Sequence, residues 1–538
     1  MIFVAGLLEV LFKALVLIGM ASAVGGAVFC LVVLRPLESV ALRRVESLKT
    51  SLMLIVCSSG LLAFAQGMVL LIEPWAFADE TGRWPLTEFL TTQFARASLL
   101  HACMGLFLLA TAIWLLKRPA SRLGWAMMTV TLVPLMASGV WLVHAASHID
   151  HAAQLMTVTV VHQFSASVWA GGVLHLAVLQ RPMRNSLKGM CLWPAVVARF
   201  SLLAVFSIAT LLVTALYLSL HYVRDWNGLI GTAYGAMAFT KASLLALVLG
   251  LGALNFFSVQ RWIQRSDGND VSKRAPALIE AEMYIAMVIL LAAATLSSQP
   301  PAVDVLAERA SPMEVLQVFS PKLPQLTPPP HQEMLAHAAS SFDLLALPST
   351  LDKIQSNFNH NICGLLLLII GIFAMLARSG KLRFVRHWPL LFLLLALFIL
   401  LVGEPAGWPF GTEGFWETLV IPEVLQHRLA ALLVASLGLF EWRVRTRDLA
   451  HTRWCFAFPL LCLAGGALLL IGSHTALEVK SAFLNEVSHN AIGFLAVGMG
   501  VGRWLELRLT RPANRLPGLL WIACMVLVSF VLLFYREA

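Results

Sequence analysis

The sequence predicts an all-α, polytopic integral membrane protein with about fourteen transmembrane helices in two bundles, of eight and six helices. Composition is the first observation behind this fold class: 59% of the 538 residues are hydrophobic and only 12% are charged, whereas an ordinary globular protein is about a quarter charged. Hydropathy is the second. Apolar runs of about 18 or more residues recur along the whole chain, and each is long enough to cross about 30 Å of hydrocarbon.

Eight apolar runs come before the longest polar interruption and form the first predicted bundle. The first run is too long for a signal peptide and lacks a small-residue cleavage site, so we expect it to remain as a helix. Helices are the only choice, because strands in lipid need a closed barrel with an alternating pattern, and these runs are apolar on all sides. The expected helices are 4–34, 51–73, 96–116, 124–146, 153–180, 191–222, 235–260 and 277–298.

Residues 299–359 form the interruption, and their proline content predicts an external linker rather than a compact domain. A short amphipathic piece is expected near 333–345. The chain therefore divides into an eight-helix membrane domain (1–298), the linker (299–359) and a six-helix membrane domain (360–538). The six later helices are expected at 360–377, 388–404, 422–442, 454–474, 486–505 and 517–535.

The net charge of +9 is explained by the placement of the basic residues. Lysines and arginines cluster in seven short loops that alternate with poorly basic ones. The positive-inside rule makes these loops cytoplasmic and predicts that both termini are periplasmic in a bacterial inner membrane. The charge therefore indicates a lipid bilayer as the partner and excludes nucleic acid. The arginines counted in these loops include Arg378, Arg443, Arg445, Arg503 and Arg508.

Most of the 15 histidines map to the outer helix ends or to the external loops. Ionisable groups at membrane depth are costly and tend to mark ion paths or cofactor sites. In the first bundle, His101 lies near an outer helix end and His162 lies deeper, in the fifth helix. His144, His148 and His151 follow an i, i+4, i+7 spacing, so a continuing helix would place them on one face.

These three imidazoles could form a metal-capture site at the membrane surface, because imidazole binds copper, zinc, nickel and iron. The alternative is that they are interfacial histidines with solvated tips. In the linker, His331, Met334 and His337 combine imidazole with a thioether, a pairing that favours cuprous copper. A solvated loop is the alternative for this motif.

The second bundle contains a short internal repeat, His-Asn-x-x-Gly. His360-Asn361-x-x-Gly364 opens one predicted helix, and His489-Asn490-x-x-Gly493 opens another. His427 begins a third helix and His474 ends a fourth. Four histidines at one outer depth suit either a copper site or bis-imidazole ligation of haem b. For haem, the glycine one turn below each His-Asn pair would make room for the ring. An accidental set of interfacial histidines is the remaining alternative.

Several short motifs between 199 and 301 resemble the membrane domain of the copper resistance protein D family. The similarity is strong in this stretch, and the upstream His162…Trp169-x-Gly171-Gly172 also resembles the family pattern. Two positions depart from it: Ala215 stands where the family has glycine, and Ala286 replaces the glycine that usually follows Glu282. The matching pieces are Arg199-Phe200-Ser201, Thr232-x-Tyr234-Gly235, Lys241, Asn255, Glu282 and Pro300-Pro301.

The last six helices resemble the C-terminal extension of longer members of this family, through Trp408-Pro409-x-Gly411 and Glu423-x-x-Gln426-His427-Arg428. The resemblance implies copper homeostasis at the bacterial inner membrane, with copper moved from periplasm to cytoplasm. It also implies a periplasmic copper-carrier partner. No β-rich carrier domain is evident in this chain, so the partner would be a separate protein.

Three functions remain open at this stage. The first is a copper permease, which is not an enzyme, with His144, His148, His151 and His162 as successive ligands. The second is a b-type haem protein for electron transfer or cupric reduction, with His360, His427, His474 and His489 as axial ligands. The third is a scaffold or metal sensor at the outer face, which the scarcity of ligands on the inner side would suit.

Overall fold

The computed structural model describes residues 2–37, 46–143, 151–184, 187–265, 274–340, 349–378, 380, 383–405, 407–446, 452–471 and 479–538. Within these ranges the chain is helical and has no β-strand, apart from one isolated bridge between Gly407 and Glu413. The predicted fold class is confirmed, since each of the fourteen predicted segments overlaps a helix.

The first bundle is arranged around α1, which packs against α3, α7 and α12. Gly25 of α1 and Gly171 of α7 lie at their crossing, where an added Cβ would clash with the backbone of the opposite helix. Two short helices, α4 (Leu86–Thr91) and α9 (Trp226–Ile230), lie between the long ones. The long helices are α1 (Ile2–Phe29, continued by the π-helical η1, Cys30–Leu34), α3 (Glu46–Thr81), α5 (Gln93–Lys117), α6 (Arg122–Val140), α7 (Ala152–Arg184), α8 (Leu187–Tyr222), α10 (Ala233–Arg265) and α12 (Ala275–Ser297).

The second bundle contains six long or medium helices joined by 3-10 turns. Its helices are α15 (Thr350–Arg378), α16 (Leu391–Val402), α17 (Pro422–Thr446), α18 (Ala457–Leu469), α19 (Val479–Arg508) and α20 (Arg515–Leu533). The 3-10 segments are η5 (Arg383–Leu390), η6 (Glu417–Val420) and η8 (Arg453–Phe456).

Eleven helices in the described ranges are long and apolar enough to cross a membrane, which makes this a multi-pass membrane protein. The apolar stretch Arg453–Leu469, which includes α18, is shorter. α7 and α19 have 33 and 30 residues but are more polar. Part of this polarity comes from His162 and Gln163 on α7 and from His489 and Asn490 on α19, so histidines predicted as ligands lie on these two helices.

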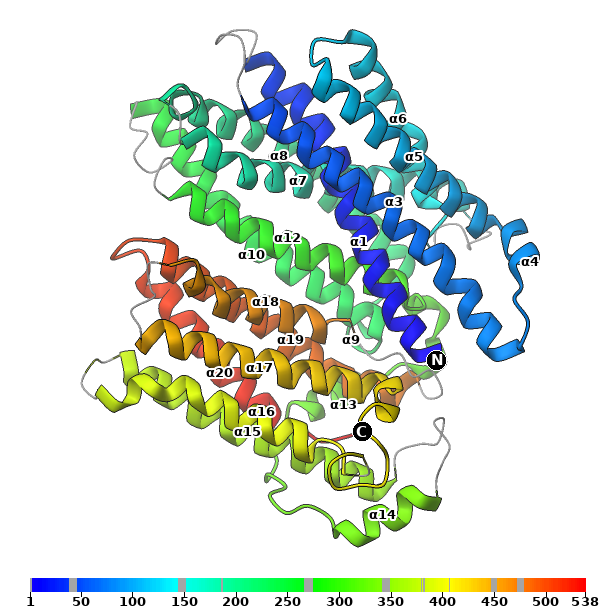
Figure 1. Cartoon of the computed structure of the whole chain (residues 1–538), viewed down its shortest axis with the longest axis vertical. Helices are drawn as coiled ribbons and strands as arrows, with labels where there is room; N and C mark the ends of the chain where they lie inside the picture. The colour runs from blue at the N-terminus through cyan, green and yellow to red at the C-terminus, as the bar shows by residue number, and fades with distance from the viewer. Residues whose placement is uncertain are drawn as a thin grey trace.

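The two bundles lie side by side, with α10 and α12 of the first against α18 and α19 of the second (Figure 1). Both chain ends lie on the side that carries α4, α9, α13 and α14 (Figure 1). We call this side the outer end and the opposite side, with the basic turns, the inner end. Near the inner end, the buried Glu280 carboxylate accepts hydrogen bonds from Arg508 Nε (2.7 Å), Trp504 Nε1 (3.1 Å) and Gln180 Nε2 (2.7 Å). These contacts connect the bundles directly.

The predicted linker is a packed segment rather than a free one. Its described part, residues 299–340, contains η3 (Ala302–Asp304), η4 (Leu306–Glu308), α13 (Pro312–Val318) and α14 (His331–Ser340), and we call it the outer cover. Arg309 binds Asp225 of the first bundle at 3.0 Å, and Glu314 binds Lys480 of the second at 2.7 Å. The Gly228 N–H and Arg309 hold the pKa of Asp225 below its ordinary value.

The boundary predicted at 359 is wrong, because α15 begins at Thr350. Ser349 and Asp352 cap this helix reciprocally: Ser349 Oγ accepts from Asp352 N (3.2 Å), and the Asp352 carboxylate accepts from Ser349 N (2.9 Å). The first turns of α15 are polar, so hydropathy does not detect them. As a consequence, His360 lies inside α15 rather than at its beginning.

Candidate metal site

Three of the four histidines predicted in the second bundle converge at its outer end. His360 of α15 lies with its ring centroid 5.5 Å from that of His489 on α19 and 6.3 Å from that of His427 on α17. We call these three residues the outer histidine cluster. In the described ranges, no three His, Cys, Asp or Glu side chains are close enough to hold a metal ion as they stand. The cluster therefore has to contract before its nitrogens can share an ion. His474 lies outside the described residues.

The hydrogen bonds of two of these histidines fix which ring nitrogen is free. His360 Nδ1 lies 2.8 Å from the Ser356 carbonyl oxygen, and His489 Nδ1 lies 3.0 Å from the Asn485 carbonyl oxygen. A carbonyl can only accept, so Nδ1 carries the proton in each ring. Nε2 is then the unprotonated nitrogen, with the lone pair that binds a metal. An Nδ1–H bond to a carbonyl is also the usual way to orient a metal-binding imidazole.

The chain that follows α20 covers the cluster. The Tyr535 ring stacks on His360 with centroids 4.0 Å apart and lies 5.8 Å from His489. Its hydroxyl donates to Glu537 at 2.6 Å, and the same carboxylate accepts from Ser356 Oγ (2.6 Å) and Asn485 Nδ2 (2.5 Å). Burial and the Glu537 charge raise the pKa of Tyr535 well above its ordinary value, so its phenol is neutral.

Sequence reasoning missed Tyr535, Glu537, Ser356 and Asn485. The sequence did contain a signal for Ser356 and Asn485, because each stands four residues before a histidine of the repeat. Four residues is one helical turn, so Ser356 lies beside His360 and Asn485 beside His489. No local pattern marks Tyr535 or Glu537, which reach the cluster through long-range contacts.

The glycines of the His-Asn-x-x-Gly repeat do not make room for haem, so this part of the prediction is wrong. An added Cβ at Gly364 would clash with the backbone of Leu533 in α20. At Gly493 it would lie 3.0 Å from the Gly466 oxygen and 3.1 Å from Leu470 in α18. Both glycines bring helices into backbone contact, and neighbouring helices fill the space that a porphyrin needs. The residues present therefore do not fit haem at these positions.

Of the three histidines predicted to share a face at 144–151, only His151 lies within the described residues. α6 ends at Val140 and α7 begins at Ala152. His151 is exposed and has φ of 62°, a left-handed conformation that an α-helix cannot contain. His151 is therefore not part of an α-helix, while His144 and His148 lie outside the described residues, so the shared face stays a prediction.

His101 and His162 are held at separate places in the first bundle. His101 Nδ1 lies 3.0 Å from Ser138 Oγ, and His162 Nδ1 lies 3.0 Å from Thr214 Oγ1. Asn255 and Glu282, two residues of the resemblance, meet between α10 and α12 at 2.5 Å.

In the described part of the linker motif, His331 and Met334 have different surroundings. His331 is exposed, and its Nε2 lies 3.2 Å from the Phe410 carbonyl, whereas Met334 is buried at 5% exposure. His337 belongs to α14, but its side chain is outside the description. A copper site at His331, Met334 and His337 stays a prediction.

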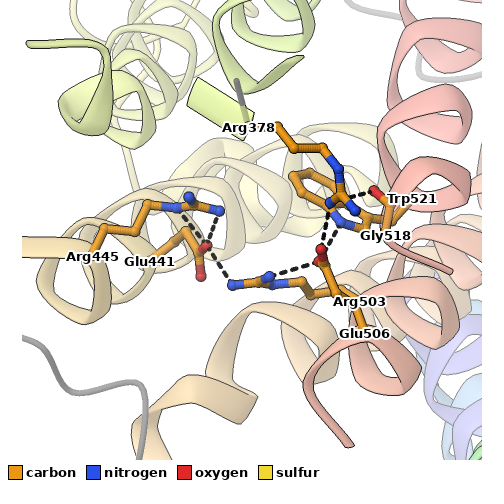
Figure 2. Close-up of polar contacts among 7 residues, drawn as sticks. All are labelled: Arg378, Glu441, Arg445, Arg503, Glu506, Gly518 and Trp521. Carbon is orange, nitrogen blue, oxygen red and sulfur yellow. Dashed lines mark hydrogen bonds and ion pairs between the residues drawn. The ribbon is translucent and has the colours of Figure 1, made fainter. Parts of the chain in front are cut away.

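The inner end of the second bundle carries an ion-pair network, shown in Figure 2. The buried Glu441 accepts from Arg445 Nε (2.8 Å) and Arg503 Nη2 (3.1 Å). Arg503 also binds Glu506 at 2.7 Å, and Glu506 accepts from Arg378 (2.5 Å) and from Trp521 Nε1 (2.8 Å). These arginines were counted as loop charges in the sequence. In the structure they lie on helices and are paired.

Comparison with known proteins identifies one segment of the chain. Residues 194–296 match the family model described as copper resistance protein D. The predicted resemblance is confirmed over this segment, which runs through most of α8 and through α10 to α12. A Bacillus subtilis protein named copper transport protein CutJ is 31% identical over 141 residues, which is 26% of this chain and 24% of that protein. The chain therefore matches about a quarter of that relative's length. No solved structure matches the chain.

Proposed function

We propose that this protein moves copper across the bacterial inner membrane and captures the ion at the outer histidine cluster. The observation that carries the proposal is the convergence of three imidazoles from three helices, two of them with Nε2 oriented as a ligand. The copper resistance protein D segment and the name of the relative supply the identity of the ion. Imidazole is among the ligands that suit copper.

The burial of the three imidazole rings indicates the order in which they bind the ion. His427 is the most exposed of the three rings, while His360 and His489 are half-buried, so we assign His427 as the first ligand. A small shift of the outer helix ends then brings the Nε2 atoms of His360 and His489 onto the ion, while both Nδ1–carbonyl hydrogen bonds are kept. Tyr535 stacks on His360 and has to slide aside or tilt as the rings close. Copper is cargo in this scheme, and no covalent bond is made or broken, so the protein is not an enzyme.

The orientation belongs to the same proposal. The basic inner end faces the cytoplasm, both chain ends lie on the periplasmic side, and copper moves inward. The outer cover, which contacts both bundles, is the part of the protein nearest to a soluble donor. We include a separate periplasmic copper-carrier protein as the donor that delivers the ion to this side.

The test is copper binding by the full-length protein in lipid nanodiscs. The triple variant His360→Ala/His427→Ala/His489→Ala is expected to bind copper at least about 100-fold more weakly, because loss of metal-orienting groups alone costs about 10–100-fold. The matched control is His221→Ala. This half-buried histidine, in the last turn of α8, also has Nδ1 bonded to a carbonyl, that of Tyr217 at 2.9 Å.

Two results contradict the proposal. One is wild-type copper affinity in the triple variant, with thermal unfolding showing that it is folded. The other is a haem absorption band in the purified protein that disappears in the same variant. Copper uptake into cells that produce each variant then tests movement separately from binding, with accumulation expected to fall in the triple variant and not in His221→Ala.

A further inference from the structure

A second group of ligand-type atoms is buried in the first bundle, where α5, α6 and α7 meet. His101 and Ser98 of α5 are 1% and 0% exposed. Gln163 of α7 also reaches Gly139 on α6. A Cβ added at Gly139 would lie 3.3 Å from His101 Cε1 and 3.6 Å from Gln163 Oε1, so both side chains reach the same small space beside α6.

The tautomer of His101 follows from its partner. Ser138 Oγ donates its only proton to the Leu135 carbonyl at 2.9 Å. The 3.0 Å contact between Ser138 Oγ and His101 Nδ1 is therefore donated by the ring, and Nε2 carries a lone pair. His101 Nε2, Gln163 Oε1 and Ser98 Oγ are all buried, and among the residues described none of the three atoms has a hydrogen-bond partner.

These atoms specify the class of ligand. Nε2 and Oε1 only accept, and a buried acceptor without a partner is costly, so the missing partner is electron-poor. An anion would be repelled by both lone pairs, and an apolar molecule would satisfy neither. Imidazole nitrogen together with amide and hydroxyl oxygen suits a first-row transition-metal ion better than magnesium or calcium, which prefer oxygen alone.

We propose that His101 Nε2 and Gln163 Oε1, together with Ser98 Oγ one helical turn before His101 on α5, form a second metal-ion site, inside the first bundle and separate from the outer histidine cluster. That the ion is copper rests on the proposed function, whereas the site itself rests on the unpartnered atoms. The chain then holds one binding site in each bundle. The second site has no charged ligand, so it binds the ion weakly enough to release it.

The experiment measures cupric ion binding to the full-length triple variant His360→Ala/His427→Ala/His489→Ala, in which the outer site is removed. We expect one cupric ion per chain to remain, with an electron paramagnetic resonance spectrum that shows coupling to imidazole nitrogen. Added to this background, His101→Ala and Gln163→Leu are expected to weaken binding by about 10-fold or more. Gln163→Glu is expected to strengthen it about 10-fold, because it adds a negative charge to a cation site. His221→Ala is the control.

The outcomes separate this inference from the proposed function. Loss of all copper in the triple variant overturns the second site and leaves the proposed function standing. Unchanged copper in the triple variant, with loss on His101→Ala, supports the second site and overturns the outer one. If Gln163→Glu does not change affinity while Ser98→Ala and Gln163→Leu bind normally, the three atoms hold only water or each other, and the inference is wrong. Ser98→Ala removes a single oxygen atom and so tests the site in case Gln163→Glu does not fold.

Discussion

The two ends of the second bundle use the same helices for opposite purposes. At the inner end, α15, α17, α19 and α20 contribute charged or hydrogen-bonding groups that are joined to one another (Figure 2). At the outer end, α15, α17 and α19 contribute the histidines, and the chain after α20 contributes Tyr535. The inner end satisfies its charges internally, whereas the outer end presents imidazole rings, two of them with Nε2 open.

This difference indicates how a helix bundle can bind and release an ion without losing its structure. Buried ion pairs are strongly coupled, because removal of one partner leaves an uncompensated charge. The imidazoles at the outer end are held by single hydrogen bonds and by ring contacts, so a small movement of the helix ends leaves no uncompensated charge. Four helices fastened at the inner end can therefore allow their outer ends to rearrange around an ion. The comparison predicts unequal responses to substitution at the two ends.

The largest effect on stability is expected from Glu441→Leu at the inner end. This change leaves Arg445 and Arg503 without their shared carboxylate, which is 1% exposed. Removal of one partner from a buried ion pair typically lowers the free energy of unfolding by about 3–5 kcal/mol. Unfolding in mixed micelles with increasing denaturing detergent measures the change, and copper affinity of the folded protein should stay close to wild type.

The matched control is Glu308→Leu, at an exposed carboxylate in the outer cover, which should change stability by no more than about 0.5 kcal/mol. Equal effects of the two substitutions would show that the inner network does not fasten the bundle. A large loss of copper affinity in folded Glu441→Leu would show that the two ends are not separable.

An intermediate effect is expected from Gly364→Ala, one turn below His360. The new methyl group would meet the Leu533 backbone, and overpacking of this kind costs about 1–3 kcal/mol. It would also push α20 away from α15 and so displace Tyr535 from His360. Gly465→Ala in α18 is the control, because an added Cβ there meets nothing within 4 Å; it should be neutral or stabilising. If Gly364→Ala is as harmless as Gly465→Ala, the glycine does not serve helix packing.

The smallest effect is expected at the exposed ion pair that joins the outer cover to α19. Lys480 and the Ser311 hydrogen bonds lower the pKa of Glu314 from 4.5 to about 2. Because the folded-state pKa is the lower one, the contribution of this pair is present above about pH 4.5 and is lost as the pH falls toward 2. A spin-label distance between α13 and α19 should stay constant from pH 7 to about 5 and increase only in stronger acid. An increase near pH 6 would contradict this assignment.

Hydropathy was sufficient to predict the helices, because a bilayer imposes length and polarity on each segment. The shared depth of His360, His427 and His489 was also predictable, since it follows from their distance to the helix ends. The spacing of Ser356 and Asn485 before the histidines was a signal that went unused. Each of these features is local in sequence.

Non-local features could not be predicted in this way. Arg503 was interpreted as a loop charge, because its partner Glu441 is 62 residues away and no sequence pattern connects the two. The role of Gly364 was misassigned because a glycine that makes room for a cofactor and a glycine that lets two helices touch look the same in a sequence. The surroundings of His101 could not be predicted either, because Ser138 of α6 and Gln163 of α7 come near it only through tertiary packing.

The contact between Glu280 and Arg508 has a consequence for biogenesis. The two residues are 228 positions apart, so the ribosome delivers α12 to the membrane long before α19 exists. Until then the Glu280 carboxylate, which in the finished protein is 5% exposed, lacks its hydrogen bonds from Arg508 and Trp504. The newly inserted first bundle therefore has to keep that face next to water, to lipid headgroups or to the insertion machinery. The first bundle obtains its full set of contacts at Glu280 only after the second bundle has been synthesised.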